Sequence, residues 1–560
     1  MLVAGVDVGN STTELAVARL EPGRGPEFQL LLRRQTTGPK GSVACAEGVA
    51  DLVDRAERRL GERPYRLILA ELHPVETDLI ELGRLEELAL GRAAVARPAS
   101  ATPSGLGVGA GMLVALPELA GTPRARAVVP VVTSEDFDEA AGALRDARKR
   151  GWTIAAAIAQ KDDAVLIGNR FDRAVPIVDE VGDAAELPLG SLCAVEVAPP
   201  GTGVVELSDP LRLAQLLELT PDEARAARIA ARAVAGHRAA LVVKNAAISS
   251  SDAFRHQPAV ELLDADGRAR PLEEHGEVPP PGTVTGMRGS LGDRDDLLDF
   301  FWRPLPLPPD DPGFVRRLAH RRAVALALVA RGSAQDLLEA VARLASGGAR
   351  VAAPESVAAV LGASTTPGAG TAPFVVDLGG GTVDLHRAEA AVTTAGAGEL
   401  VTRICSALLD CSRALGERAK RRPSARIETP FMLHHEDGTR TFVGEPVPPR
   451  ALGRLCVIEP RELLPLDAPL APEVWRLLRR AAKRDVLARN VRRAIDEAGG
   501  VPRGELVTLV GGSACDPEVA DTVAAELVDL DVAVARGNVL GRHGPRGAVA
   551  VGLILADGGG

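Results

Sequence analysis

The feature that most constrains the fold is a short acidic, glycine-containing phrase that occurs twice, about 370 positions apart. The first copy reads Asp7-Val-Gly-Asn-Ser-Thr-Thr-Glu14, and the second reads Asp377-Leu-Gly-Gly-Gly-Thr-Val-Asp384. Short apolar runs flank the turns, so each copy is expected to form a strand, a tight turn and a second strand. A hairpin of this kind can hold phosphate in its turn.

The residue types in the turns suit an anion and a hydrated cation. Glycine and small hydroxyl residues let backbone N–H groups approach phosphate closely, and Asn10, Ser11 and Thr12 fit this role. Asp7 and Asp377 are placed at strand ends, where a carboxylate can hold a hydrated Mg²⁺ or orient an attacking water. Both are candidate catalytic residues, and either could orient the nucleophile. Two such turns facing each other would clamp a triphosphate.

A third segment extends this pattern, because the apolar run that ends at Val510 leads into Gly511-Gly512-Ser513. Two adjacent glycines would let a base or ribose lie against bare backbone. Two phosphate hairpins and a late Gly-Gly loop occur in this order in the duplicated ATPases related to actin, Hsp70 and sugar kinases, which the chain resembles. The fold expected is therefore α/β, with a duplicated actin-like (ribonuclease H-like) ATPase core. The alternative, an ordinary α/β protein with three glycine-rich turns, leaves their order unexplained.

Length, charge and cysteine content limit the functional classes. A chain of 560 residues is too long for one core. A net charge of −10 gives no general attraction to nucleic acid or anionic membranes. The six cysteines are scattered without metal-ligand spacing, and no signal peptide or membrane-spanning run is apparent. We expect a cytoplasmic protein that binds neither nucleic acid nor membrane.

The chain between the two hairpins is longer than one half of such an ATPase requires, which indicates an inserted domain. A strand at 127–132, a helix at 136–150 and a strand at 152–158 form an α/β pattern of their own. A further short strand is expected at 164–167. We place the first part of the ATPase core at 1–95 and the inserted domain at 96–245.

The segment that follows the insert has a different composition. Proline, glycine and mixed charges predict an irregular connector up to about residue 313, and helical periodicity then predicts helices at 314–330 and 333–345. We assign 246–350 to this connector and helical part, and 351–560 to the second part of the core.

Four further motifs have both functional and structural interpretations. The turn Gly396-Ala397-Gly398-Glu399 opens a helix whose N–H groups could point at phosphate. A basic helix at 472–498 is expected to turn its arginines to solvent and Leu477 inward. The sequence His434-His435-Glu436-Asp437 is expected to form an exposed hairpin tip rather than a metal site. In the insert, three oxygen-bearing side chains could bind Mg²⁺ or Ca²⁺ if the fold gathers them, although capping and turn roles are the simpler interpretation: Thr102, Asp162 and Asp179.

Taken over nearly its full length, the chain resembles the large subunit of the diol/glycerol dehydratase-reactivating factor. The resemblance is specific because the matching motifs of the insert belong to no generic actin-like ATPase. The segments that carry it are Gly5 to Glu14, Gln160 to Arg170, Pro176 to Val181, Leu361 to Gly368, His435 to Gly438, Leu509 to Ser513, Arg536 to Asn538 and Gly544 to Arg546. The match weakens between about 245 and 350.

The resemblance implies a function, ligands and partners. It implies an ATPase that binds ATP/ADP and Mg²⁺ and acts like a chaperone, releasing damaged cobalamin from an inactivated adenosylcobalamin-dependent diol or glycerol dehydratase. It implies a heterotetramer of two large and two small subunits, and it allows a location in a bacterial microcompartment. Its metal site would use Thr102, Asp162 and Asp179 in a swivelling domain at the interface with the small subunit, which would supply a further ligand. Its nucleotide contacts would be Asn10, Ser11, Thr12, Gly396, Ala397, Gly398, Glu399, Gly511, Gly512 and Pro545.

Other functions are compatible with the same ATPase core. A small-molecule kinase would transfer phosphate to an acceptor in the cleft, with an aspartate as base. An acyl-CoA dehydratase activator would use cysteines to hold an iron–sulfur cluster, but Cys405 and Cys411 lack a suitable loop setting. A filament-forming actin homologue is the weakest alternative, because no sequence feature indicates a self-assembly surface.

Overall fold

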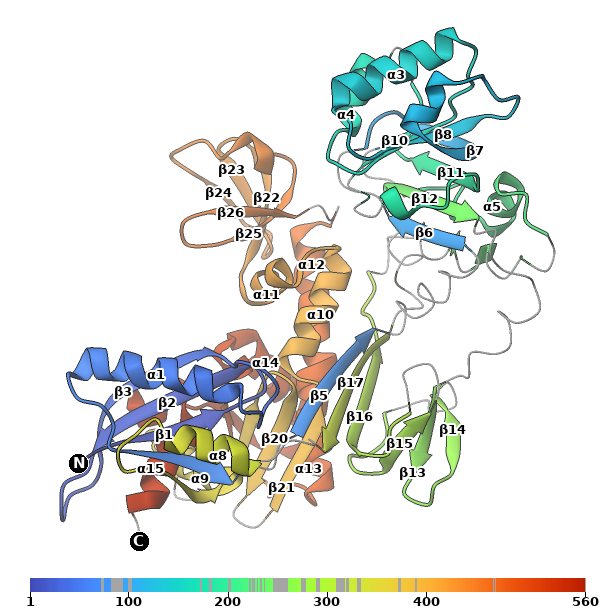
Figure 1. Ribbon diagram of the computed structural model, residues 1–560. Helices are drawn as coiled ribbons and strands as arrows, with labels where there is room; N and C mark the ends of the chain where they lie inside the picture. Colours follow the sequence, from blue (N-terminus) through green and yellow to red (C-terminus); the bar gives the residue numbers. More distant parts are fainter. Residues whose placement is uncertain are drawn as a thin grey trace. The chain divides into compact units, whose positions relative to one another are not determined.

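The protein is described from a computed structural model, in which the chain forms two compact units (Figure 1). The core unit contains Met1–Ile80, Pro258–Pro306 and Ala323–Gly560, and the inserted unit contains Glu81–Gln257 and Leu307–Arg322. The residues that the structure describes are 1–71, 75–81, 94–98, 103–171, 174–179, 181, 184–199, 203–220, 223, 227–228, 230–231, 234–235, 237–244, 260–272, 278–288, 293–308, 318, 322–329, 334–370, 374–387, 390–466, 468 and 470–558.

The core unit contains two five-stranded sheets that have the same topology. In each sheet three consecutive antiparallel strands are followed by two parallel ones, in the orders β18-β4-β1-β2-β3 and β28-β27-β19-β20-β21. This repetition confirms the expected duplicated ATPase core. The strands of the first sheet are β1 (Leu2–Val8), β2 (Thr12–Arg19), β3 (Glu27–Gln35), β4 (Arg66–Glu71) and β18 (Ala349–Pro354). Those of the second are β19 (Phe374–Leu378), β20 (Thr382–Arg387), β21 (Ala390–Ala395), β27 (Leu506–Val510) and β28 (Ala533–Arg536).

The two acidic phrases form equivalent hairpins in these sheets. Asp7 pairs with Glu14 across β1 and β2, and Asp377 pairs with Asp384 across β19 and β20. The turns also close alike, since the N–H of the first glycine donates to the carbonyl of the threonine three residues later at 3.0 Å and 3.1 Å. Both predicted hairpins are therefore confirmed, in matching register.

Two small-residue helices lie between the sheets. The helices α9 (Glu355–Ala363) and α15 (Ala548–Gly558) pack on each other and share an apolar cluster with residues of β1, β2, β19 and β27. Their contact is so close that a Cβ placed on Gly552 would lie 1.8 Å from the carbonyl oxygen of Ala358. Any larger residue there would separate the helices. Because both sheets pack on this pair, the two hairpins face a common space.

Three further sheets complete the core unit. The orders are β14-β13-β15, β16-β17-β5 and β24-β23-β22-β25-β26. The strands are β5 (Val75–Glu81), β13 (Glu261–Asp264), β14 (Ala269–Pro271), β15 (Val284–Arg288), β16 (Leu297–Pro304), β17 (Arg322–Val329), β22 (Ser424–Thr429), β23 (Met432–His435), β24 (Arg440–Phe442), β25 (Leu455–Ile458) and β26 (Leu463–Leu466).

Two expectations for the region after the insert were wrong. Residues expected to form an irregular connector contain β13 to β16, and part of the helix expected at 314–330 is strand β17. A short apolar run is compatible with either structure, and β17 is buried at six of its eight positions between β16 and β5. The second expected helix is confirmed as α8 (Ala334–Ala342).

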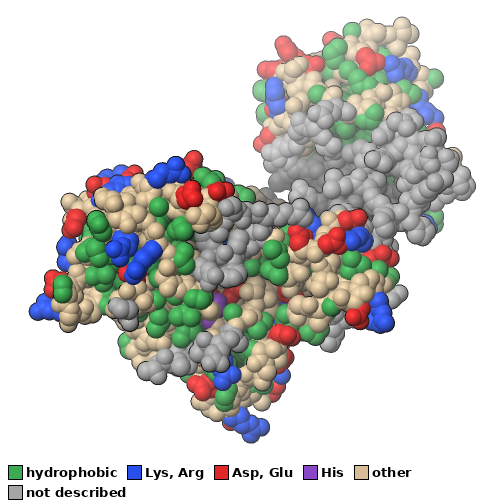
Figure 2. Space-filling view, turned by 60° about the horizontal axis from the view of Figure 1, so that its bottom comes forward, with side chains coloured by type: hydrophobic (Ala, Val, Ile, Leu, Met, Phe, Trp, Pro, Cys, Tyr) green, Lys and Arg blue, Asp and Glu red, His purple; other side chains and the backbone are tan. Residues whose placement is uncertain are grey.

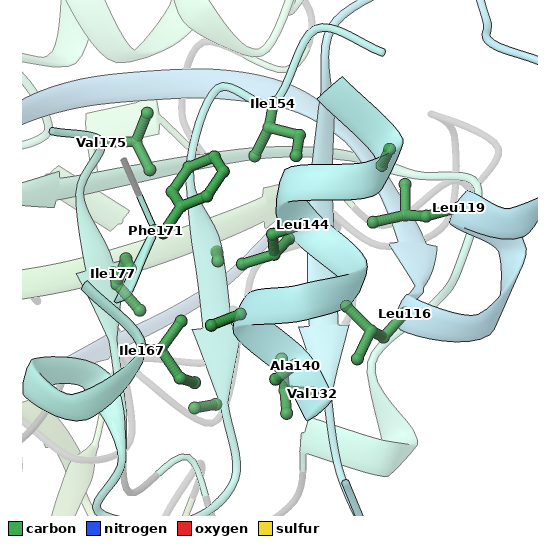
Figure 3. Close-up of a cluster of buried hydrophobic side chains, with 14 of the residues drawn as sticks. Leu116, Leu119, Val132, Ala140, Leu144, Ile154, Ile167, Phe171, Val175 and Ile177 are labelled. Carbon is green, nitrogen blue, oxygen red and sulfur yellow. The ribbon is translucent and has the colours of Figure 1, made fainter. Parts of the chain in front are cut away.

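The inserted unit is built on a seven-stranded sheet. Its order is β10-β9-β8-β7-β11-β12-β6. The bounds are β6 (Ala94–Pro98), β7 (Gly107–Ala115), β8 (Val128–Val132), β9 (Ala157–Ala159), β10 (Ile177–Val178), β11 (Leu192–Val197) and β12 (Ala239–Lys244), with helices α3 (Phe137–Lys149), α4 (Ala164–Arg170) and α5 (Pro210–Leu216). Figure 3 shows Leu144 of α3 and Ile167 of α4 pointing into a cluster with Phe171.

The expected strand at 164–167 is helix α4. The Asp179 carboxylate accepts a hydrogen bond of 3.0 Å from the Ala164 N–H, which caps the first turn. Ala164 and Ile167 are buried at helical spacing, so the short apolar run has a helical period. Strand β9 also begins later than expected, because Ile154 forms only an isolated bridge with Val128.

The expected basic helix forms one continuous helix, but two of its side chains face the opposite way from the prediction. It comprises α12 (Pro472–Lys483), a π-helical segment (Arg484–Ala488) and α13 (Arg489–Glu497). Arg479 is 2% exposed and Leu477 is 68% exposed, which reverses the predicted orientation of both. The Arg479 guanidinium binds the carboxylates of Glu436 at 2.8 Å and Glu518 at 2.6 Å. Glu436 therefore points inward from a hairpin whose Asp437 turn is exposed.

The distribution of surface charge and the hydropathy of the helices bear on nucleic-acid and membrane binding. On the face drawn in Figure 2, acidic and basic side chains of the core unit are interspersed, so this face presents no extended field of one sign to a polyanion. Among the helices of the described residues, none is long and apolar enough to cross a bilayer.

Candidate functional site: a phosphate-type pocket in the core unit

One pocket of about 720 Å³ lies between the two hairpins of the core unit. It is lined by both turns, by the loop after β27 and by the start of helix α10 (Gly398–Leu409). The turns face each other closely, because a Cβ on Gly380 would lie 1.9 Å from the Ser11 hydroxyl oxygen. The pocket therefore offers two sets of backbone N–H groups to one anionic ligand.

The carboxylates at the base of the pocket are partly buried and lie close enough to influence one another. Burial raises the pKa of Asp377 to about 8, with further contributions from Asp384 and Glu355. Burial also raises the pKa of Asp7 well above its usual value, and Glu355 adds to the effect. Ionised carboxylates at this density repel one another, so the site favours a cation or retained protons. A hydrated divalent cation held partly by phosphates would stabilise the ionised forms.

Lys40 is the buried cation within this group. Its Nζ lies 3.2 Å from the Glu355 carboxylate, at the first turn of α9. Burial opposes the charged form of Lys40, but Glu355 and Asp7 outweigh this effect and raise its pKa. A lysine held protonated beside two phosphate-type turns is suited to contact a phosphate oxygen. Sequence reasoning missed Lys40 and Glu355, because 315 residues separate the two partners.

The other end of the pocket combines cations with hydrogen-bonding groups on α10 and α11 (Arg413–Arg421). The Lys420 Nζ donates to the Gly398 carbonyl at 2.9 Å and to the Thr402 hydroxyl at 2.7 Å, and it pairs with Glu417 at 2.5 Å. Burial lowers the pKa of Lys420 despite the opposing effect of Glu417. This carboxylate and ammonium pair could bind vicinal hydroxyls such as those of ribose. It was also missed from the sequence.

The structure brings most of the predicted nucleotide residues to this pocket. The lining includes Asp7, Asn10, Ser11, Thr12, Asp377, Gly398, Glu399, Gly511 and Gly512. Gly396, Ala397 and Pro545 lie behind the lining and support it. The Gly396 N–H donates to the Gly381 carbonyl at 2.9 Å, and the Gly511 N–H donates to the Pro545 carbonyl at 2.8 Å. Ala397 is buried directly before α10.

Arg546, next to Pro545, lines the pocket itself. Its guanidinium lies 3.1 Å from the Glu14 carboxylate, and the Gly547 N–H donates to the same carboxylate at 2.6 Å. These contacts connect the first hairpin to the loop before α15. Glu14 is thus held by two partners, whereas its counterpart Asp384 accepts hydrogen bonds from Thr382 and Thr393.

The acidic residues predicted in the inserted unit follow neighbouring strands. Asp162 comes after β9, and Asp179 comes directly after β10, which runs parallel to β9. The Asp179 carboxylate accepts the hydrogen bond from the Ala164 N–H at the first turn of α4. Thr102 lies outside the described residues, although Ser104 forms an isolated bridge with Ile177 of β10. Within the described residues, no group of three His, Cys, Asp or Glu side chains has metal-binding geometry.

Comparisons with known proteins match both units. Residues 313–557 match the family described as diol dehydratase reactivase ATPase-like domain, and residues 95–248 match the DD-reactivating factor swiveling domain. The chain is 33% identical to the propanediol dehydratase-reactivating factor large subunit of Salmonella typhimurium, covering 99% of this chain and 98% of the relative. It is 32% identical, with the same coverage, to the diol dehydratase-reactivating factor large subunit of Klebsiella michiganensis.

Solved structures give the same result. A structure of diol dehydratase-reactivating factor in nucleotide-free form is similar with a TM-score of 0.57, 29% identity and coverage of 100% of both chains. A structure of glycerol dehydratase reactivase is similar with a TM-score of 0.57, 28% identity and the same coverage.

Proposed function

Because the chain belongs to the family of diol dehydratase-reactivating factor large subunits, we propose that it couples ATP hydrolysis to reactivation of an adenosylcobalamin-dependent diol or glycerol dehydratase. The observation that carries the proposal is the pocket between two equivalent hairpins in a chain that also contains the family's inserted unit. In this scheme the damaged cobalamin leaves the dehydratase, and intact coenzyme then enters.

The pocket geometry suggests how a nucleotide would bind. The turns at Asn10 to Thr12 and Gly379 to Gly381 would hold the phosphates, with Lys40 beside them. Gly511 and Gly512 leave bare backbone for the adenosine, and Glu417 with Lys420 would bind the ribose hydroxyls.

Asp7 and Asp377 fit a hydrated Mg²⁺, which proteins often hold through one or two carboxylates together with substrate phosphates and water. Bound there, the ion would neutralise charge that develops on the transferred phosphoryl group. The chain itself would hold the attacking water through one of the two carboxylates and exclude bulk water through the facing turns. We propose both aspartates as catalytic residues.

The inserted unit and the partners complete the proposal. Thr102, Asp162 and Asp179 are proposed to bind a divalent cation in the swivelling domain, at the interface with the small subunit of the factor. The names of the relatives as large subunits support a small-subunit partner. A heterotetramer of two large and two small subunits is proposed, located in the cytoplasm or a bacterial microcompartment.

The alternative activities have less support. The relatives that match the full chain are dehydratase-reactivating factors rather than kinases. For an iron–sulfur activator, burial raises the pKa of Cys405 to about 11 and that of Cys411 to about 12, which disfavours the thiolate form that a cluster requires.

Reconstitution tests the proposal. The chain and its small subunit would be mixed with glycerol-inactivated dehydratase, ATP, Mg²⁺ and fresh coenzyme, and dehydratase activity would be followed over time. Activity should return with ATP and stay absent when a non-hydrolysable analogue replaces it. Failure of ATP to restore activity to either a diol or a glycerol dehydratase would contradict the proposed function.

A further inference from the structure

The sheet β16-β17-β5 carries most of the chain connections between the two units. The chain leaves the core unit after Ile80, in β5, and again after Pro306, just beyond β16. It returns at Ala323, at the start of β17. Three of the four crossings therefore occur at strands of one sheet, which Figure 1 shows side by side, and the fourth is at Pro258.

The same sheet lies against the glycine turns of the nucleotide pocket. A Cβ on Gly381 would lie 2.3 Å from the Thr77 hydroxyl oxygen of β5. A Cβ on Gly396 would lie 3.2 Å from Phe301 of β16 and 3.2 Å from Ala325 of β17. Gly396 also has a φ of +89°, which favours glycine. Its N–H donates to the Gly381 carbonyl, so a hydrogen bond joins the two glycine turns that pack on this sheet.

A buried polar cluster joins these glycine turns to the sheet. Asp299 of β16 is 1% exposed, and its carboxylate accepts a hydrogen bond of 2.7 Å from the Ala395 N–H. The guanidinium of Arg493 on α13 binds both oxygens of the same carboxylate, at 2.8 Å and 3.1 Å. Asn490 donates to the carbonyls of Ala395 and Gly396, at 2.7 Å each, and accepts from Arg493 at 2.8 Å. The cluster thus holds the Ala395 N–H and the carbonyl groups of Ala395 and Gly396, directly before Ala397 and α10.

We propose that Asp299, Asn490 and Arg493 are positioning residues that transmit the state of the nucleotide turns to the strands from which the inserted unit departs. The inference rests on the proposed function, because it requires nucleotide in the pocket. A shift of Gly381 and Gly396 around the phosphates would move Ala395. Asp299 must follow, since releasing that N–H or Arg493 would leave a buried charge without its partners. Strand β16 would then carry the change to its connection with the inserted unit.

Hydrogen exchange with and without nucleotide tests this connection in the full chain bound to its small subunit. Asp299→Asn keeps the shape and an acceptor for Ala395 but removes the charge that holds Arg493. Arg493→Lys keeps the charge but removes the bidentate contact with the Asp299 carboxylate. Arg492→Lys is the matched control, because Arg492 is adjacent on α13 but binds Asp496 and Asp529 on the exposed side. ADP affinity is measured for each by calorimetry, and dehydratase reactivation is measured in parallel.

In the unchanged complex, Mg²⁺ and ADP should slow exchange of the amides in β16 and β17 by about tenfold, a typical coupling between sites. Either variant should reduce this slowing to about twofold or less and lower reactivation, while ADP affinity changes by less than about fivefold. The control should behave like the unchanged chain.

The outcomes separate the two claims. Full nucleotide-dependent slowing in both variants, or its absence in an unchanged chain that binds ADP, would overturn the inference and leave the proposed function standing. An unchanged chain that binds no ADP would overturn both. Should one variant fail to fold, the other variant and the unchanged chain still give a decisive result.

Discussion

Replacing Asp377 by asparagine is expected to stabilise the nucleotide-free protein at alkaline pH while it abolishes ATP turnover. Asp377 is the penultimate residue of β19 at the base of the pocket, where burial, then Asp384 and Glu355, raise its pKa from 3.8 to about 8. An ionised carboxylate at this position can bind the cation that accompanies a nucleotide. Without that cation, its negative charge destabilises the folded protein. Asparagine keeps the shape of the side chain and removes the charge.

The sign of the effect follows from proton binding. Between about pH 4 and pH 8 the unfolded chain has lost the Asp377 proton that the folded chain retains, so the stability of the folded protein falls as the pH rises. Each pKa unit is worth about 1.4 kcal/mol, which gives a penalty of up to about 6 kcal/mol above pH 8. The neighbouring carboxylates share protons with Asp377, so we expect Asp377→Asn to recover at least about 2 kcal/mol there. Near pH 4 the two proteins should be equally stable.

Urea unfolding in EDTA, without nucleotide, measures this difference at about pH 4.5 and about pH 8.5. The matched control is Asp521→Asn, an exposed position on α14 (Pro517–Glu526), which should change stability by less than about 0.5 kcal/mol at both values. ATP hydrolysis of Asp377→Asn should be lost while ADP binding stays measurable. A variant that is no more stable than the unchanged protein at the higher pH, or that hydrolyses ATP normally, would refute the reasoning.

Three further substitutions test other parts of the structure. Gly380→Ala should weaken ATP binding by about tenfold or more in calorimetry, because its Cβ would meet the Ser11 hydroxyl, whereas Gly444→Ala, with open space around it, should not. Lys420→Met should weaken ADP binding by about 10- to 100-fold, since the pocket loses the ammonium donor beside Glu417 while Arg421 still pairs with that carboxylate; unchanged affinity would place the ribose elsewhere. Arg479→Met should lower the free energy of unfolding by about 2 to 3 kcal/mol, because it removes the buried guanidinium that binds both Glu436 and Glu518 although Lys483 still binds Glu518, and a loss below about 1 kcal/mol in urea unfolding would contradict this role.

The parts of the fold that sequence reasoning recovered are those fixed by local chemistry. The hairpins at Asp7 and Asp377 could be predicted because their turns require glycine and small polar residues in a set order. The same local logic placed Gly398, Gly511 and Gly512 at the pocket. The duplicated core then followed from the repetition of the hairpin.

The parts that were missed depend on partners distant in sequence. Arg479 lies at a helical position compatible with an exposed face, and its burial becomes favourable through partners from other segments: the carboxylates of Glu436 and Glu518 and the carbonyl of Arg422. Strand β17 reads equally well as helix until β16 and β5 flank it. Lys40 gave no local signal, because its role appears only when Glu355 reaches it across the core.

The most direct test of the central claim is the release of damaged cobalamin from an inactivated dehydratase, followed by absorbance after the enzyme is separated from small molecules. With the chain, its small subunit, Mg²⁺ and ATP, the cofactor should leave the dehydratase, and Asp377→Asn should release none above the level seen without ATP. Release that is equally fast with the unchanged chain and with Asp377→Asn, or release that needs no ATP, would contradict the account.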